Sequence, residues 1–374
     1  MSNLPHPHPM SNLPHPMSNL PHSMSNLPHP MSNVPHPMSN LPHPMANLPH
    51  PMSSNPNFIG PMPPPRISQQ NFFMPQYQHL QSPSITRVDG YMPTEQEKLV
   101  LDITNPNDEV KEMAIAELSM KKELHYNLGP LLMNSFGTMT ELLKEVVSIY
   151  HCLSPPTLSP NSSDKTCNAL SLLQCVASHP ETKMLFLEAH FPLFLYPFLN
   201  TTSRSKPFDY LRLTTLGVIG SLVKTDSPDV VCYLVTTEIV PLCLQIIEMG
   251  CELSKSVATY IVLRIIHDEI GLKYILEHPE RLFIVGEVLG NLAVSIINDH
   301  QSIRLIKNII RCFLRISEDD RACEILREFL PNIFINGALH NLFVDDNATS
   351  GMLNQLIHNV NVALGISVAS RVLM

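Results

Sequence analysis

The chain of 374 residues is 44% hydrophobic and only 6% aromatic, contains no tryptophan, and has a formal net charge of −9 at pH 7. This composition excludes a wholly disordered chain and favours a helical protein over a β-sandwich, and the acidic balance argues against attraction to nucleic acid over the whole surface. Residues 1–65 contain no Asp, Glu, Lys or Arg, so the N-terminal part and the remainder require separate interpretation.

Residues 1–58 form a low-complexity tail in which the unit Met-Ser-Asn-Leu-Pro-His-Pro restarts every seven residues from Met10 to Met45. Most units carry two prolines, which exclude the continuous helix of a coiled coil, so we expect a disordered or polyproline-like tail. Its histidines leave weak binding of transition metals as an alternative, but a repeat-expanded linker is favoured, and we predict no metal site and no cofactor. Residues 59–93 continue rich in Pro and Gln and are expected to be a linker.

The sequence shows no targeting segment and no membrane span. No basic region followed by an apolar core opens the chain, and the strongly apolar run at 193–199 is far shorter than the ~20 residues of a spanning helix. The eight cysteines form no CxxC pair and mostly lie in apolar helical runs, which indicates buried thiols rather than disulfides or a metal framework. We therefore expect a protein of the cytoplasm and the nucleus, without a membrane partner.

The folded region is expected over residues 94–362 and begins with two amphipathic helices, at EQEKLVLDI and NDEVKEMAIAELSMKK. After them, polar hinges recur between apolar helices: SMKKE at 119, SHPE at 178, TDSPD at 225, HDE at 267 and SEDD at 317. Their separations of 59, 47, 42 and 50 residues are close to the ~40–47 residues of armadillo and HEAT units, once the insertion at 155–163 is allowed for. The pattern predicts an all-α, armadillo-type solenoid of about six repeats, with residues 363–374 fraying at its end.

The hinge at 178 shows why one repeat cannot stand alone. Ser178 and Glu181 have the spacing of a capping box, and Pro180 falls in the first turn of the following helix. The two helices are therefore joined almost without a loop, and each needs neighbours to bury its apolar face. His179 and His278 both lie in His-Pro-Glu triplets at helix starts, where capping is favoured over catalysis.

Catalytic motifs are absent from the sequence, which has no GxSxG, P-loop, dinucleotide fingerprint or HExxH. Gly217 and Gly220 lie within a helical run, so close helix packing explains them better than a phosphate-binding loop. Glu318, Asp319 and Asp320 suit the positive end of a helix dipole better than a metal site. We therefore predict that the chain is not an enzyme.

Two helical stretches could instead line a binding groove. Tyr210, Leu213 and Gly217 are spaced i, i+3, i+7, and Leu253 and Val257 are one turn apart. On the inner surface of a solenoid they would accept an amphipathic partner helix. Periodicity alone favours ordinary core burial for these residues.

A basic cluster accompanies these stretches, comprising Arg204, Lys206, Arg212 and Lys224. It could flank a path for nucleic acid or for an acidic peptide. Solvated helix ends explain the cluster equally well.

Several long strings resemble one known family. They are LLQCVASHPETK, FPLFLYPFLNTTS, PFDYLRLTTLGVIGSLVKTD, TTEIVPLCLQIIEMG, ELSKSVATYIV and RCFLRISEDDRA. On these strings the chain resembles the "required for cell differentiation" family, the armadillo-repeat, non-catalytic subunit of the CCR–NOT deadenylase complex. The resemblance covers about residues 95–362 and excludes the tail, and the strings MLFLEAH and FLNTTSRSKPF look most like plant members.

The resemblance implies an adaptor that docks on the NOT scaffold subunit and binds peptide motifs of RNA-binding regulators, in mRNA deadenylation, decay and translational repression. On the match FGTMTELLKEVV, the scaffold-binding positions would be Phe136, Thr140 and Val147. Their helical spacing places them on one stripe. Thr140 and Glu141 stand where the family usually has two alanines, so this sequence departs from the family at the proposed interface.

The resemblance also implies further sites. The peptide groove would fall on the two stretches described above, and the residues are Tyr210, Leu213, Gly217, Leu253 and Val257. A pocket for a tryptophan of a silencing partner would fall on Pro241, Leu242, Arg281 and Arg321. Pro279 replaces the aromatic wall of that pocket, and Arg281 could still stack on an indole. Departures such as Met133 leave open whether these interactions are weakened.

An alternative function is a direct nucleic-acid-binding cofactor in transcription or mRNA control, for which Arg204, Lys206 and Arg212 are the candidates. Weak nucleic-acid binding by an adaptor and a homodimer also stay open as further alternatives.

Overall fold

The computed structural model describes residues 93–298 and 302–372, with side chains described over 93–297 and 302–361. The predicted tail at 1–58 and all of the linker except Pro93 lie outside the described residues. Within the described ranges every regular element is a helix, which confirms the all-α prediction. The domain boundaries drawn from the sequence stay predictions.

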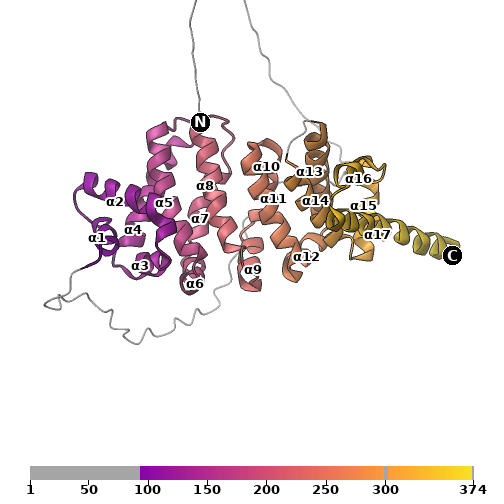
Figure 1. Cartoon of the computed structure of the whole chain (residues 1–374), viewed down its shortest axis with the longest axis horizontal. Helices are drawn as coiled ribbons and strands as arrows, with labels where there is room; N and C mark the ends of the chain where they lie inside the picture. The colour runs from indigo at the N-terminus through magenta and orange to yellow at the C-terminus, as the bar shows by residue number, and fades with distance from the viewer. Residues whose placement is uncertain (1–92, 299–301, 373–374) are drawn as a thin grey trace, which may run out of the picture. The chain divides into compact units, whose positions relative to one another are not determined.

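The helices form three rows, and in each row neighbouring members are in contact (Figure 1). The row of long helices comprises α2 (Asp108–Lys121), α5 (Pro160–Ser178), α8 (Lys206–Leu222), α11 (Glu252–His267), α14 (Ile303–Ile316) and α17 (Asn347–Val372). The second row comprises α3 (Leu128–Asn134), α6 (Pro180–Glu188), α9 (Pro228–Thr236) and α12 (Glu269–Leu276). The third comprises α4 (Thr138–Ser148), α7 (Phe191–Leu199), α10 (Ile239–Met249) and α13 (Pro279–Asn298).

The remaining helices close the two ends of the rows. The first, α1, packs on α2, and α15 packs on α13 and α17. Their bounds are α1 (Glu95–Asp102), α15 (Asp320–Phe329) and α16 (Ala338–Leu342), with 3-10 turns at Lys122–Leu124, Tyr150–Cys152 and Asn332–Phe334. The helix α17 continues into the segment 363–374 that is predicted to fray, so that boundary stays a prediction.

All five polar hinges lie where a long helix ends, as the recurrence predicts, and four of them lead directly into the next short helix. The hinge at 119 is followed by a 3-10 turn, and α3 begins only at Leu128. The predicted capping box assigns the wrong N-cap residue to α6, because the N-cap is His179 and not Ser178. Ser178 is the last residue of α5 and donates its hydroxyl to the carbonyl of Cys175 at 3.0 Å. His179 has the extended backbone of an N-cap, and its Nδ1 accepts from the amide of Glu181 at 3.3 Å. Pro180 is the first residue of α6, where its missing N–H costs no hydrogen bond.

The corner between α11 and α12 has no loop and depends on Gly271. A Cβ atom on this residue would lie 1.9 Å from the carbonyl oxygen of Ile265. Because a backbone atom cannot move aside, only glycine fits at this position.

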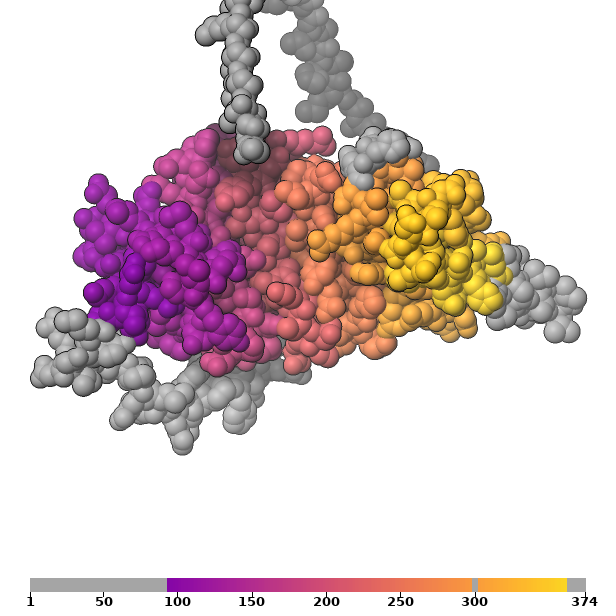
Figure 2. Space-filling view, in the orientation of Figure 1, coloured from indigo at the N-terminus to yellow at the C-terminus, as the bar shows by residue number. Residues whose placement is uncertain are grey.

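One continuous hydrophobic core runs through the described repeats, from Val100 to Val360. Because each repeat covers the apolar faces of its neighbours, the stack buries surface that a single repeat would expose. Figure 2 shows the repeats following one another in chain order as adjoining bands. The exposed faces of the rows are therefore built from residues one repeat apart in the sequence.

All eight cysteines are free thiols, and Cys167, Cys243, Cys312 and Cys323 are buried, as predicted, whereas Cys232 is exposed. Burial raises the pKa of Cys167 to about 11 and that of Cys243 to about 12. These thiols therefore stay protonated near neutral pH and are poor nucleophiles.

Across the described residues, no single helix is long and apolar enough to cross a membrane. Only α9 and α10 taken together pass that test, and they are bent by 77° at their junction.

Candidate functional site

The stripe predicted for scaffold binding is exposed in the structure. Phe136 precedes α4 and is fully exposed, and Thr140 and Val147 lie on the exposed side of the helix. Gly137 has a φ of 79°, in the left-handed region that favours glycine, and turns the chain into α4 directly after Phe136. The opposite side of α4 is buried through Leu142 and Val146, so the helix is anchored on one face and free on the other.

The departure at Glu141 does not obstruct this stripe. Its carboxylate accepts from Lys111 at 2.9 Å and from Lys144 at 2.6 Å, in a polar cavity between α2, α4 and α5. The Lys144 and Lys111 hydrogen bonds lower the pKa of Glu141. Only Thr140 of the departing pair lies on the exposed face.

Glu145 lines the same cavity in a less favourable environment, because burial raises the pKa of its carboxyl group. Its surroundings include Lys165 and Lys111, which oppose the rise, and Glu112 and Asp108, which add to it.

Glu145→Gln is therefore expected to raise the melting temperature at about pH 7.5, well above the unfolded carboxyl pKa of about 4.3. A raised folded-state pKa means that the ionised group destabilises the fold, so the gain should shrink as the pH falls and vanish below about pH 4. Glu141→Gln is the matched control and should have the opposite sign, since its ionised form is stabilised by two lysines. Thermal unfolding by circular dichroism across this pH range measures both, and a gain that does not depend on pH would contradict the assignment.

Apolar exposure continues from α4 onto α7, which the sequence analysis missed. Leu193 and Phe194 are exposed on α7, although this helix is among the most apolar of the chain. The hydroxyl of Tyr150, just beyond α4, donates to the carbonyl of Phe194 and ties the two helices together at this point. Neighbouring exposed apolar side chains on two contacting helices are typical of a protein interface.

The predicted peptide-groove residues lie on the exposed side of the row of long helices, hereafter the long-helix face. Tyr210 is 49% exposed and Leu253 is 65% exposed, while Leu213, Gly217 and Val257 are half-buried. Core burial, which periodicity alone favoured, therefore does not apply to this set. A cavity of about 570 Å³ opens on the face, and Gly217 and Val257 are among its lining residues.

The cavity is completed by residues that sequence reasoning missed. They include Tyr126, Gln174 and Tyr260. Gln174 of α5 donates to the carbonyl of Gly217 at 3.2 Å and accepts from Lys122 at 3.1 Å. Gln174 lies on α5 and Tyr260 on α11, and these positions in the row of long helices are the signal that could have found them, whereas Tyr126 lies between a 3-10 turn and α3.

Close helix packing, which the sequence analysis offered for the glycines of α8, does not require glycine at either position. A Cβ on Gly220 would lie 3.6 Å from Val257, and one on Gly217 would lie 3.5 Å from the Gln174 side chain. Both are ordinary van der Waals distances, so alanine would fit at either position. Because Gly217 has no side chain, it leaves the cavity open at this position.

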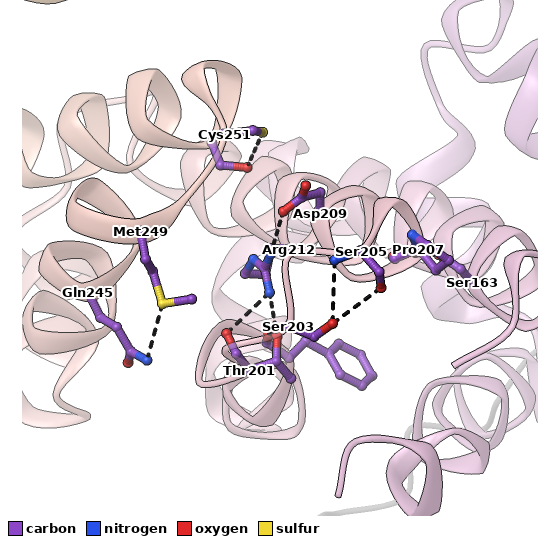
Figure 3. Close-up of polar contacts among 12 residues, drawn as sticks. Ser163, Thr201, Ser203, Ser205, Pro207, Asp209, Arg212, Gln245, Met249 and Cys251 are labelled. Carbon is purple, nitrogen blue, oxygen red and sulfur yellow. Dashed lines mark hydrogen bonds and ion pairs between the residues drawn. The ribbon is translucent and has the colours of Figure 1, made fainter. Parts of the chain in front are cut away.

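Arg212 cannot belong to an exposed basic cluster, and this candidate is wrong. Its side chain is 0% exposed, and Figure 3 shows the guanidinium between Asp209 and Thr201. It is paired with the Asp209 carboxylate and donates to the carbonyl and hydroxyl oxygens of Thr201 at 3.2 and 3.0 Å. The arginine therefore fixes the α7–α8 connection to α8. Arg204 and Lys206 remain exposed.

A second cavity, of about 550 Å³, lies between α11, α14 and α17 and is more basic than the predicted cluster. Its lining includes Arg264, Arg304, Lys307, Arg311 and Arg315, against a single glutamate. The spacing of four of these residues on one side of α14 is the sequence signal for this surface, and the sequence analysis did not use it.

Two of the four residues predicted for a tryptophan pocket come together. Pro241 and Arg281 line one cavity of about 590 Å³ between α10 and α13, together with several glutamates. Leu242 packs against the core, and Arg321 lies on α15, so neither lines this cavity. The Arg281 guanidinium already stacks on the Tyr274 ring, 3.7 Å from its centroid, so an incoming indole would compete with it.

The acidic run at 318 has structural roles. Asp319 caps α15 by accepting from the amides of Arg321 and Ala322 at 3.0 Å, and Glu318 pairs with Arg315. No group of three or more His, Cys, Asp or Glu side chains positioned for a metal ion occurs among the described residues.

Comparison with known proteins agrees with this geometry. A family model described as "Cell differentiation family, Rcd1-like" matches residues 99–360. Cell differentiation protein rcd1 of Schizosaccharomyces pombe is 51% identical over 251 residues, which is 67% of this chain and 88% of that protein. Protein CAF40 of Saccharomyces cerevisiae is 50% identical over 251 residues, which is 67% of this chain and 67% of that protein.

Solved structures confirm the armadillo-type fold. A designed armadillo repeat protein in complex with the peptide (KR)4 matches with a TM-score of 0.52 at 14% identity, over 71% of this chain and 100% of that chain. Computationally designed armadillo repeat proteins for modular peptide recognition match with a TM-score of 0.53 at 15% identity, over 71% of this chain and 99% of that chain. Identities this low show the fold alone.

Proposed function

The chain belongs to the Rcd1-like cell differentiation family, and on this premise we propose that it is a non-catalytic subunit of the CCR–NOT deadenylase complex. It docks on the NOT scaffold through the exposed side of α4 and offers the long-helix face to short motifs of RNA-binding regulators. Regulators held in this way bring their mRNAs to the deadenylase, in the cytoplasm and the nucleus. The observation that carries the proposal is the exposed stripe on α4, on a helix whose other side is buried in the repeat core.

The physical basis of scaffold docking is burial of apolar side chains that the isolated subunit exposes. Phe136 is fully exposed, and covering a phenylalanine contributes about 1.5–3 kcal/mol. Val147 lies at the other end of the same stripe, and Leu193 and Phe194 extend the surface onto α7. A partner helix laid along α4 would cover these side chains together.

Val147→Tyr is expected to remove the scaffold from affinity-purified complexes, because the larger side chain would hold a partner helix away from the stripe. The matched control is Val344→Tyr, the same substitution at an exposed valine beyond α16. The measurement is recovery of the scaffold with each tagged, full-length variant, with circular dichroism as the folding control. Equal recovery with both variants would refute docking at α4.

A direct nucleic-acid role is less well supported. With Arg212 buried, two of its three candidate residues remain, Arg204 and Lys206, on a chain whose net charge is −9. If these residues bound phosphates, affinity would fall steeply with salt, and reversing both charges would reduce that slope.

A further inference from the structure

The two cavities of the long-helix face meet at one side chain. Tyr260 of α11 lines both the cavity at Gly217 and Val257 and the basic cavity between α11 and α14. Along α11, Val257, Tyr260 and Arg264 are spaced i, i+3 and i+7, so one side of the helix changes from apolar to aromatic to cationic. A peptide that runs along α11 from Val257 past Tyr260 therefore passes from the cavity at Gly217 into the basic cavity.

Most cations of the basic cavity already have partners. Arg264 is paired with Asp226, and Arg315 is paired with Glu269 and Glu318. Lys307 pairs with Asp346 at 2.6 Å, and these bonds reduce the charge that a ligand would meet.

Arg304 and Arg311 are different, since neither has an acidic partner within salt-bridge distance in the part of the chain that the structure describes. Both are exposed, and they are seven residues apart on α14, which places them about 10 Å apart along the helix axis. The guanidinium group is suited to bidentate pairing with carboxylates. Acidic side chains two turns apart on a helical ligand would match this spacing.

We propose that the basic cavity binds an acidic segment that flanks the apolar motif seated at Gly217 and Val257, with Arg304 and Arg311 as its principal anchors. The inference rests on the proposed role of the long-helix face as a peptide groove. It specifies the ligand class: a peptide with apolar anchors at helical spacing and a cluster of Asp or Glu at one end.

Acidic peptide is favoured over nucleic acid by the distribution of charge. A nucleic-acid strand presents a phosphate about every 3.4 Å and needs a continuous cationic path. Here the basic cavity has only Arg304 and Arg311 without a salt bridge among the described residues, and in the adjoining cavity Lys122 and Lys224 are accompanied by Glu123 and uncharged side chains. Tyr260 and His267 are the only aromatic rings lining the basic cavity within the described ranges, which is fewer than a stacking platform for successive bases uses.

The test is a selection of random 16-residue displayed peptides on the full-length chain and on three variants. The double variant Arg304→Glu/Arg311→Glu reverses the proposed anchors. Lys273→Glu/Arg327→Glu makes the same charge change at exposed residues of α12 and α15 outside both cavities, and is the matched control. The third variant, Val257→Glu, tests the apolar part.

Peptides selected by the wild type are expected to carry both apolar anchors and an acidic cluster, and the Lys273/Arg327 variant should select the same class. The Arg304/Arg311 variant should lose the acidic enrichment and bind a fluorescein-labelled wild-type-selected peptide at least tenfold more weakly. That difference should diminish in about 0.5 M salt, where the screening length falls to a few ångströms.

Three results would overturn the proposal, and they can be told apart. If the selected peptides depend on Val257 but show no acidic enrichment, the peptide groove is supported and the acidic segment is refuted. If no selected peptide depends on Val257, the peptide groove itself fails, independently of scaffold docking through Val147. A labelled oligo-dT that binds more tightly than the acidic peptide, and loses affinity in the Arg304/Arg311 variant, would assign the cavity to nucleic acid.

Discussion

Arg212→Met is expected to lower the free energy of unfolding by about 3 kcal/mol, the low end of the cost of breaking a buried ion pair. Methionine keeps most of the apolar stem but removes every donor. The Asp209 carboxylate and the Thr201 carbonyl would then lose their partners in a site where Arg212 itself is 0% exposed. Asp209 retains some access to solvent, which is why the estimate stays at the low end.

Chemical unfolding of the full-length variants, followed by circular dichroism, measures this effect. Arg204→Met is the matched control, since Arg204 is exposed and surface substitutions change stability by about 0.5 kcal/mol or less. Adding Asp209→Leu to Arg212→Met should recover part of the loss, because no unpaired carboxylate would remain. If Arg212→Met were as stable as Arg204→Met, the pair would have no structural role.

Val257→Glu is expected to weaken peptide binding on the long-helix face by at least about thirtyfold. The introduced carboxylate would lie in the cavity beside Gly220, and burying it under a ligand would cost about 2 kcal/mol or more. The fold should tolerate the change, because Val257 is only half-buried and the new group can reach solvent in the free protein. Fluorescence anisotropy with a wild-type-selected peptide gives the affinity, and circular dichroism checks the fold.

Val344→Glu is the control for this experiment, since it makes the same substitution at an exposed valine outside the groove. Tyr210→Ala is a second variant that adds no charge, and it should weaken binding less, because Tyr210 lies outside the lining of the cavity. If Val257→Glu bound the peptide with wild-type affinity, the cavity at Gly217 and Val257 would be excluded as the peptide site.

The repeat architecture is predictable from the sequence because its signals are local. A polar hinge interrupts helical periodicity at the end of five of the long helices, four of them with a proline or an acidic cap, and each hinge can be recognised within a few residues. The error at Ser178 is one of register within such a hinge. His179, which also lies in the motif, is the residue whose extended backbone places a side-chain acceptor over the amide of Glu181.

The candidate site is predictable only in part, since helical spacing assigns residues to a stripe but does not say whether a neighbour covers it. Phe136, Thr140 and Val147 are all exposed, but Phe136 lies in the turn before α4, so the helical spacing relates only Thr140 and Val147. For Tyr210 and Leu253, spacing alone favours burial, and the structure shows them exposed.

The amino-acid sequence by itself determined the helices, the hinges between them and the stacking of about six repeats, because short-range periodicity and capping encode these features. Only the tertiary structure decided which cations are available. Arg204 and Arg212 belong to the same short basic cluster, yet one is exposed and the other is closed in by Asp209 and Thr201. Arg304 and Arg311 face the same cavity as Arg264, one repeat earlier, because stacking brings α14 against α11. Burial and charge pairing depend on such contacts between repeats, which no single stretch of the chain contains.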